Sequence, residues 1–313
     1  MTEATHSFRG SGKLLISGEY VILEGATGLA IPVRYGQNLD VWMSEDAEEL
    51  LWQSEDMYEM LWFEARINKS NLSVISTNNS TIAGSLTSVM KFIKDLNPAW
   101  WKQVQRLKFK IDFPKQWGLG TSSTMIYTLS EASGLDPYEM LRATFGGSGY
   151  DIACASANAP ILYSRNEFGQ AELEAIPFEP IKSDQFAFVY LGNKADTAAS
   201  ISYFKSLGKV PNSLIDEISD ISTSLTKARS HEYMIELLQR HEYLIGTYLK
   251  IEPVQKRLFT DFKGVVKSLG AWGGDFVCVL SEDPMDDYSY FYNKGYYNVF
   301  PFKKMIKPVF QVF

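Results

Sequence analysis

The sequence predicts an α+β protein that folds into two lobes, 1–180 and 181–313. Short apolar runs typical of strands dominate the first half, whereas the second half carries long stretches with helical periodicity. Segregation of strands from helices along a chain favours the α+β class over a regular alternation. The length of 313 residues leaves room for two domains of ordinary size.

The strands of the first half are predicted from two kinds of apolar pattern. A continuous run is followed by the turn pair Glu24-Gly25 and a second run, which indicates two neighbouring buried strands. Further along, Leu107, Phe109 and Ile111 alternate with polar residues, which indicates a half-buried strand. The expected strands are 14–22, 29–33, antiparallel strands within 39–76, and 107–113.

Helical periodicity predicts one long helix in the first half and several in the second. Residues 81–96 place their apolar side chains on one face, and Asn97-Pro98 ends the pattern. The second half is therefore expected to be rich in helix. Its expected helices are 197–207, 213–228, 232–249 and 254–269, and its expected strands are 186–191, 276–280 and 296–300.

Composition and charge narrow the class of protein. Hydrophobic residues make up 45% and charged residues 21%, which is ordinary for a globular chain. A net charge of −7 argues against a protein that binds nucleic acid mainly through phosphate contacts. With two cysteines, no secretory leader pattern and no apolar run long enough for a membrane span, a cytoplasmic protein is expected.

The loop that begins at Trp117 is the first candidate for a functional site. It lies between an expected strand and an expected helix, and it combines glycines, which allow close backbone approach, with hydroxyl residues. It is neither a Walker loop nor a dinucleotide fingerprint, and a plain helix cap at Ser122 or Ser123 is the structural alternative. The residues expected to hold phosphate are Gly118, Leu119, Gly120, Thr121, Ser122 and Ser123.

Four segments, in order along the chain, carry a resemblance to a known family. Gly118–Ser123 resembles the Gly-Leu-Gly-Ser-Ser-Ala motif of the GHMP kinases, the family of galactokinase, homoserine kinase, mevalonate kinase and phosphomevalonate kinase. Gly12–Gly25 resembles the first motif of that family, and Gly270–Asp275 resembles its third. Gly147–Asp151 is similar to the aspartate segment of the mevalonate and phosphomevalonate kinase branch.

The resemblance implies a fold, a reaction and its cofactors. The fold would be the two-lobe GHMP kinase fold, with a ribosomal-protein-S5-domain-2-like N-terminal lobe and a ferredoxin-like C-terminal lobe. The reaction would be phosphoryl transfer from ATP, with Mg²⁺, to mevalonate or phosphomevalonate in isoprenoid precursor synthesis. The stretch Gly-Glu-Tyr-Val-Ile-Leu-Glu that begins at Gly18 favours this branch over the sugar kinases.

Two residues are expected to act on the substrate hydroxyl. Asp151 can accept its proton, and Lys13 can hold that carboxylate ionised and stabilise the developing charge. The resemblance to mevalonate kinases implies the same lysine and aspartate pair. The structural alternatives are a solvated lysine at a strand end and a helix-capping aspartate.

Further site residues are implied by the resemblance. Ser122 is expected to coordinate Mg²⁺, whose acidic ligand would come from Glu19, Glu131 or Glu139. His6, His231 and His241 have no ligand spacing and are given no catalytic role. The residues expected to bind substrate are Glu19, Ser148, Gly149, Thr197, Gly273 and Gly274.

Some residues depart from the family pattern and keep other functions open. Ser11 replaces the usual proline of the first motif, Thr124 replaces a small residue after the second, and Trp272 is bulky for the third. The alternatives are a lyase related to diphosphomevalonate decarboxylase, a kinase for homoserine or a sugar, and a nucleotide-binding sensor without catalysis.

Overall fold

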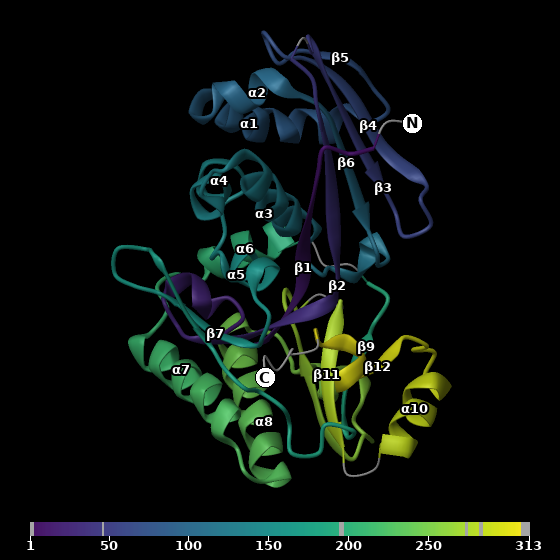
Figure 1. Ribbon diagram of the computed structural model, residues 1–313. Coiled ribbons are helices and arrows are strands. Elements are labelled where there is room, and N and C mark those ends of the chain that lie inside the picture. Colours follow the sequence, from purple (N-terminus) through teal and green to yellow (C-terminus); the bar gives the residue numbers. More distant parts are fainter. Residues whose placement is uncertain (1–2, 46, 194–196, 273–274, 282–283, 308–313) are drawn as a thin grey trace, which may run out of the picture. The chain divides into compact units, whose positions relative to one another are not determined.

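The computed structural model describes residues 3–45, 47–193, 197–272, 275–281 and 284–307 (Figure 1). Its strands form an eight-stranded mixed sheet and a four-stranded antiparallel sheet, as the α+β prediction requires. The strands are β1 His6–Ser17, β2 Gly28–Met43, β3 Glu49–Glu55, β4 Leu61–Asn68, β5 Val74–Thr77, β6 Val104–Ile111, β7 Ile161–Arg165, β8 Ala171–Ala175, β9 Phe186–Tyr190, β10 Gly264–Ser268, β11 Phe276–Ser281 and β12 Val299–Pro301. The helices are α1 Ser80–Leu96, α2 Pro98–Gln103, α3 Thr121–Ser133, α4 Pro137–Thr144, α5 Tyr150–Ser156, α6 Thr197–Ser206, α7 Asn212–Lys227, α8 His231–Leu249, α9 Val254–Leu258, α10 Pro284–Asn293 and α11 Phe302–Met305, with 3₁₀ turns η1 Val21–Glu24 and η2 Lys115–Trp117.

Contacts within the chain divide it into two compact units, each built from separate segments. The first unit consists of Met1–Gly12, Tyr35–Lys115 and Leu119–Ser156, and the second of Lys13–Arg34, Gln116–Gly118 and Ala157–Phe313. The long strands β1 and β2 contribute residues to both units, so the units are interleaved in sequence. The expectation of a single lobe boundary at residue 180 stays a prediction.

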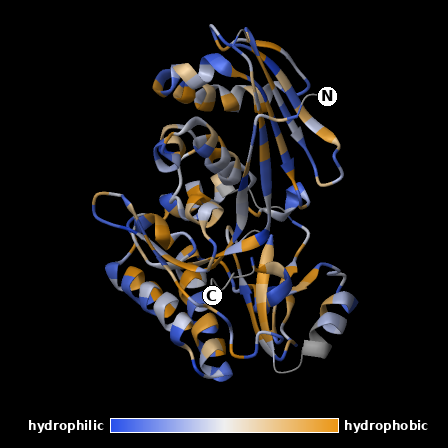
Figure 2. Cartoon of the chain, viewed as in Figure 1, coloured by the Kyte–Doolittle hydropathy of each residue, from blue (hydrophilic) through white to orange (hydrophobic). Residues whose placement is uncertain are grey.

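The first unit packs helices on one face of its part of the mixed sheet (Figure 1). Strand order runs β5-β4-β3-β6-β2, with β3 parallel to β6 and the other neighbours antiparallel. Buried side chains from β2, β3, β4 and β6 and from α1 to α5 form one core, in which Trp52 stacks on Phe109 with ring centroids 5.0 Å apart. Hydrophobic residues lie on both the strands and the helices of this unit (Figure 2).

Local capping explains why the predicted helix 81–96 is found almost unchanged as α1. Its N-cap Asn79 accepts the amide of Ile82, and its apolar face is buried. Asn97 ends α1 and at once begins α2, because its side chain accepts the amide of Trp100 and Pro98 takes the first helical position. The expected strand at 107–113 is confirmed as β6, slightly earlier in the chain.

The second unit contains the antiparallel sheet, in the order β10-β11-β9-β12, together with helices α6 to α11. The helices expected at 213–228 and 232–249 are confirmed as α7 and α8. A core of β9, β10 and β11 side chains, α9 and Phe291 of α10 fills one side of the sheet. This unit also holds the last residues of β1 and the first residues of β2.

Two sequence expectations in this unit are wrong at their ends. The strand expected at 14–22 stops at Ser17, because Gly18 has φ +99 and a Cβ there would lie 2.7 Å from the Gly28 Cα. The helix expected at 254–269 is the short α9 followed by strand β10. Gly264, with φ +135, begins that strand where a Cβ would lie 2.3 Å from the Leu280 carbonyl oxygen.

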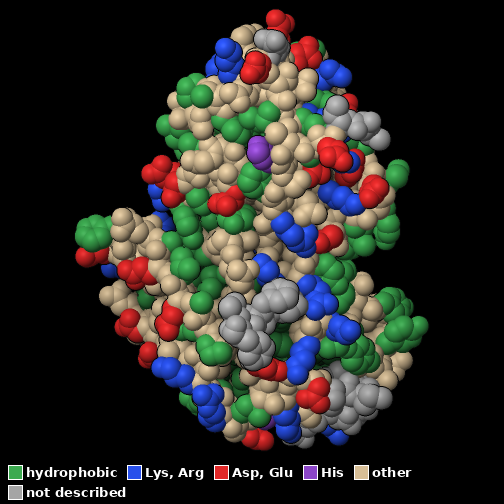
Figure 3. Space-filling view, viewed as in Figure 1, with side chains coloured by type: hydrophobic (Ala, Val, Ile, Leu, Met, Phe, Trp, Pro, Cys, Tyr) green, Lys and Arg blue, Asp and Glu red, His purple; other side chains and the backbone are tan. Residues whose placement is uncertain are grey.

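The distribution of surface charge and the length of the helices were compared with what nucleic-acid binding and membrane crossing require. Acidic and basic side chains are interspersed over the face drawn in Figure 3. None of the helices in the described part of the chain is both long enough and apolar enough to cross a membrane.

Candidate functional site

The loop that begins at Trp117 is held in the second unit by its first two residues. Trp117 is buried and packs its ring on Tyr190 and edge-on against Phe276, with centroids 6.3 and 6.0 Å apart. Gly118 has φ +66, a conformation that favours glycine, and a Cβ there would lie 2.5 Å from Asp275 Oδ2. The second and third sequence motifs therefore meet at Gly118 and Asp275.

Lys13 also belongs to this contact. Its Nζ donates to the carbonyl oxygen of Gly118 at 3.1 Å, so an ammonium group of the first motif lies at the start of the second. One residue from each of three motifs, Lys13, Gly118 and Asp275, thus lies at this contact in the second unit.

The N-terminus of α3 has the geometry of an anion site. Gly120, at φ +95, is the N-cap, and no side chain caps the helix. The first intrahelical bond is donated by Thr124 to the Gly120 carbonyl oxygen, so the amides before it need other partners. Backbone N–H groups and the helix dipole at such an end favour a phosphate group.

The hydroxyl residues of this loop differ in exposure. Ser122 is exposed and Ser123 is buried. Thr124 is also buried, and its hydroxyl donates to the Gln37 side-chain oxygen at 2.8 Å. Of the three, Ser122 is therefore the hydroxyl that solvent and a metal ion can reach.

Asp151 lies in the first turn of α5, directly after a glycine loop. Gly147 and Gly149 have φ +113 and +91, conformations that favour glycine. The Asp151 Oδ2 accepts a short hydrogen bond from the Ser123 hydroxyl, which fixes the carboxylate against α3. The structure therefore brings together the aspartate motif and the phosphate-loop motif inside the first unit.

The remaining predicted substrate residues fall into two groups. Ser148 is half-buried and Gly149 is buried, and both lie in the loop that leads into α5. Thr197 begins α6, but its side chain is outside the described part of the structure, as are Gly273 and Gly274. Their substrate contacts stay predictions.

Glu19 occupies an enclosed position. Its side chain has 0% exposure, and Oε1 lies 2.6 Å from Lys267 Nζ. Its other oxygen lies 3.2 Å from His241 Nε2, the atom that accepts the Gly18 amide at 2.9 Å. The described contacts of the Glu19 carboxylate are therefore internal, and its expected substrate and Mg²⁺ roles stay predictions.

Glu242 completes this buried cluster behind Lys267. Its carboxylate accepts the Ser268 amide and hydroxyl at 3.0 and 2.9 Å, and the Val254 amide at 3.1 Å. Burial raises the pKa of Glu242 above its usual value. The cluster consists of Glu19, His241, Glu242 and Lys267, and it ties the end of β1 to α8 and β10.

The first motif is also fixed to the third through Tyr20. Its hydroxyl donates to the Ala271 carbonyl oxygen at 2.7 Å, and its ring stacks on Phe204 with centroids 5.3 Å apart. Burial raises the pKa of Tyr20 to about 12. Tyr20 has φ +65, which is costly for a non-glycine residue, so these contacts hold a strained turn in place.

Metal ligation cannot be assigned to an acidic cluster. Among the described residues, no group of three or more His, Cys, Asp or Glu side chains is placed to hold a metal ion. Glu131 is exposed on α3, and Glu139 lies on α4 with an oxygen 4.0 Å from Arg142. Neither glutamate is brought to Ser122 by a contact in the structure.

Sequence reasoning missed Lys267 and the role of His241. Lys267 lies in the range 254–269 expected to be helical, where the structure has strand β10. A lysine inside the apolar run Val265 to Leu269 is a usable signal of a buried charge with a partner. His241 was assigned no catalytic role, and the structure places it in the buried cluster as an acceptor of a backbone amide.

The titration of Glu19 gives a first prediction. Burial raises its pKa from 4.5 to about 7, so the native state keeps a proton that the unfolded chain releases between these values. The free energy of unfolding therefore falls as pH rises through this range, by about 2 kcal/mol between about pH 5.5 and 7.5 from this group alone. Urea unfolding at both pH values should show that the Glu19→Gln variant lacks this loss.

His241 provides the internal check on that prediction. Burial lowers its pKa, which gives the opposite slope because the unfolded chain then binds the extra proton. The Glu19→Gln variant keeps this contribution, so the difference between wild type and variant isolates Glu19. An identical pH slope in both proteins would show that Glu19 does not titrate in this window.

Comparison with solved structures finds the same fold in small-molecule kinases. Mevalonate kinase of Methanococcus jannaschii is 17% identical, with a TM-score of 0.66 over 94% of this chain and 96% of that one. Phosphomevalonate kinase of Streptococcus pneumoniae, solved with phosphomevalonate and AMPPNP, is 16% identical, with a TM-score of 0.66 over 93% and 97%. Galactokinase of Lactococcus lactis, solved with galactose, is 10% identical, with a TM-score of 0.62 over 91% and 87%.

Sequence comparison alone does not reach these proteins. No model of a known protein family and no curated protein matches the chain. The two-lobe fold that the motifs implied is nevertheless the fold of these kinases, and most of the chain takes part in it.

Proposed function

We propose that the protein is an ATP-dependent kinase that phosphorylates a small alcohol, with mevalonate or phosphomevalonate as the substrate. The observations that carry the proposal are contacts between motifs inside each unit. Lys13, Gly118 and Asp275 meet in the second unit, and Ser123 of the same loop binds Asp151 in the first. The fold shared with mevalonate and phosphomevalonate kinase structures supports the same conclusion.

The residues of the phosphate loop fit a nucleotide. The uncapped N-terminus of α3 offers amide donors, and the positive φ of Gly120 lets the backbone approach a phosphate without a side chain in between. Ser122 is exposed at that end and is proposed as a Mg²⁺ ligand. When bound, ATP would supply the phosphoryl group and Mg²⁺ would neutralise its charge.

Asp151 is proposed as the group that takes the proton of the substrate hydroxyl. The hydrogen bond from Ser123 orients its carboxylate, and orientation of the base is what proton removal requires. Lys13 is proposed to stabilise negative charge on the transferred phosphoryl group, with the Gly118 carbonyl oxygen fixing its ammonium. Ser123 is thus a positioning residue as well as part of the loop.

The choice of substrate rests on the aspartate segment. Ser148 and Gly149, directly before α5, are proposed to contact the substrate beside Asp151, with Thr197, Gly273 and Gly274 as further contacts. Similar folds also act in galactokinase and in a heptose phosphate kinase, so a sugar is the alternative substrate class. Phosphorylation of mevalonate or phosphomevalonate would place the protein in isoprenoid precursor synthesis, and a cytoplasmic location is proposed from its two cysteines.

Two measurements test the proposal. Thermal unfolding with AMPPNP and Mg²⁺ at about 100 times Kd should stabilise the protein by about 2.7 kcal/mol, because only the native state binds. A coupled ADP assay over mevalonate, phosphomevalonate, homoserine, galactose and a heptose phosphate should then show one preferred alcohol. Carbon dioxide release with ADP would indicate a decarboxylase, and tight nucleotide binding without turnover on any alcohol would indicate a sensor.

A matched pair of glycine variants tests the phosphate loop. Gly120 and Gly134 flank α3, both with positive φ, so Ala at either position costs about 1 kcal/mol of backbone strain. Only Gly120→Ala should weaken AMPPNP binding, by about tenfold, because relief of the strain displaces the amides that hold phosphate. Isothermal titration gives both affinities, and equal binding by the two variants would remove Gly120 from the site.

A further inference from the structure

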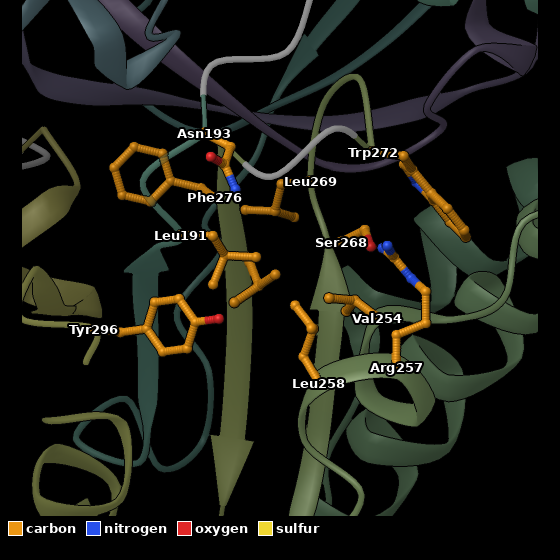
Figure 4. Close-up of a pocket in the computed structure, with 11 residues that line it drawn as sticks. Leu191, Asn193, Val254, Arg257, Leu258, Ser268, Leu269, Trp272, Phe276 and Tyr296 are labelled. Carbon is orange, nitrogen blue, oxygen red and sulfur yellow. The ribbon is translucent and has the colours of Figure 1, made fainter. Parts of the chain in front are cut away.

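A pocket of about 190 Å³ lies in the second unit (Figure 4). It is at the end of the four-stranded sheet where β9 and β10 finish and β11 begins. One side of the pocket is formed by α9, and the surface of the pocket is apolar and polar in about equal parts. The apolar lining residues are Leu191, Val254, Leu258, Leu269, Phe276 and Val277.

Trp272 gives this pocket a hydrogen-bond donor that none of the described residues uses. Its side chain is 5% exposed, and its indole Nε1 has no hydrogen-bond partner among the described residues. A buried N–H without an acceptor is costly, and native proteins rarely keep one. The indole N–H can therefore donate to an acceptor on a molecule bound in the pocket.

The orientation of the Trp272 ring is fixed from the other side. A Cβ on Gly246 of α8 would lie 3.4 Å from both Cη2 and Cζ3 of the indole, so the far edge of its six-membered ring rests on the helix at a glycine. The opposite, pyrrole edge carries the N–H. Trp272 also has φ +57, a strained conformation for this residue type, as is common at ligand sites.

Arg257 adds a positive charge to the same side of the pocket. Figure 4 shows its side chain extending toward Ser268, and Arg257, Ser268 and Trp272 all line the pocket. One of its five donors, Nε, is used by the Glu252 carbonyl oxygen at 3.0 Å. The Ser268 hydroxyl donates to Glu242, whose carboxylate lies behind the pocket wall and is itself satisfied by three hydrogen bonds.

We propose that this pocket binds a compact organic anion whose apolar body fills the cavity and whose carboxylate or phosphate is held by Arg257 and the Trp272 indole. None of the lining residues that the structure describes is an Asp or Glu, so the polar side of the pocket favours negative charge. A cavity of 150 Å³ holds benzene, so about eight non-hydrogen atoms fit here. The inference does not depend on the kinase activity.

The test uses 4-methylpentanoate as the probe and the intact protein labelled with ¹⁵N at tryptophan. The chain has 7 tryptophans, and the Trp272→Phe variant identifies the Trp272 indole signal in the NMR spectrum. Titration with the probe should move that signal saturably, because the indole N–H gains an acceptor. Butyl phosphate is titrated in parallel, and the tighter anion identifies the head group.

Variants of α9 separate the charge of Arg257 from unspecific effects. Arg257→Gln should weaken binding at least about tenfold, because a charge-assisted hydrogen bond is lost. Lys256→Gln removes the neighbouring charge, which does not line this pocket, and should leave the affinity within about twofold. Both side chains are exposed, so neither change threatens the fold.

The neutral analogue 4-methylpentanamide has the same size as the probe and should bind at least about tenfold more weakly. The proposal is overturned if the Trp272 signal stays in place at about 10 mM of either anion, well above what a built anion site requires. Equal affinity for amide and carboxylate, or an unchanged affinity in Arg257→Gln, would overturn it as well.

Discussion

Asp151→Asn is expected to lower kcat by about a thousandfold while the protein stays folded and binds nucleotide, because a general base contributes about 10²–10⁴-fold. Asparagine keeps the size of the side chain and can still accept the Ser123 hydroxyl, but it cannot take a proton. Rates with the preferred alcohol, nucleotide affinity and thermal unfolding are to be measured on the same preparation. If phosphoryl transfer is so dissociative that the proton leaves late, the loss is smaller.

Asp136→Asn is the matched control in the same unit. Asp136 is the N-cap of α4, where its side chain accepts the Glu139 amide at 2.7 Å, and asparagine caps helices about as well as aspartate. This variant should keep both stability and rate. If kcat of Asp151→Asn is as little changed as kcat of Asp136→Asn, Asp151 is only an acid at a helix terminus and not the base.

Lys13→Met extends the same argument to the second proposed residue. It removes the ammonium group and also the hydrogen bond to the Gly118 carbonyl oxygen, so both kcat and nucleotide affinity should fall. If Lys13 and Asp151 serve one transfer step, the double variant should lose less free energy of activation than the sum of the two single losses. Strict additivity would separate their roles.

The parts of the fold that could be predicted were those set by local pattern. Helices α1, α7 and α8 follow from periodic apolar faces and nearby caps such as Asn79 and Ser230. The apolar pattern predicted the wrong structure at 254–269. The spacing there indicates one helix, but the structure has the short helix α9 followed by the buried strand β10. Only the pairing of β10 with β11 distinguishes them, and that contact is made by residues elsewhere in the chain.

The candidate site shows the same division. Glycines at positive φ, such as Gly118 and Gly120, and the hydroxyls beside them are local features, so the loop could be found in the sequence. The partner of Glu19 could not be found, because Lys267 is 248 positions away and was assigned to the wrong element. Buried charges pair through tertiary contacts, and a single sequence does not show which residues far apart in the chain lie close together in the fold.

That pairing leads to the largest expected change in stability. Lys267→Met should destabilise the protein by about 3–5 kcal/mol, because it leaves the enclosed Glu19 carboxylate without its cation. The effect should be larger at about pH 8 than at about pH 6, because a carboxylate without its cation can avoid the penalty by taking up a proton. Urea unfolding at the two pH values measures both the loss and its direction with pH.

The large loss expected in Lys267→Met comes from burial of the ion pair. An exposed ion pair of the same length serves as the control. Lys91 of α1 makes a contact of the same length, 2.6 Å, with Asp95, but on the surface, where the side chains are 66% and 55% exposed. Lys91→Met should cost no more than about 0.5 kcal/mol. The double variant Glu19→Gln/Lys267→Met should recover part of the lost stability, since no charge of the pair then remains buried. Two results would contradict this prediction: a loss in Lys267→Met as small as that in Lys91→Met, or a double variant less stable than Lys267→Met. Either would show that Lys267 stabilises the protein through packing of its side chain and not through its charge.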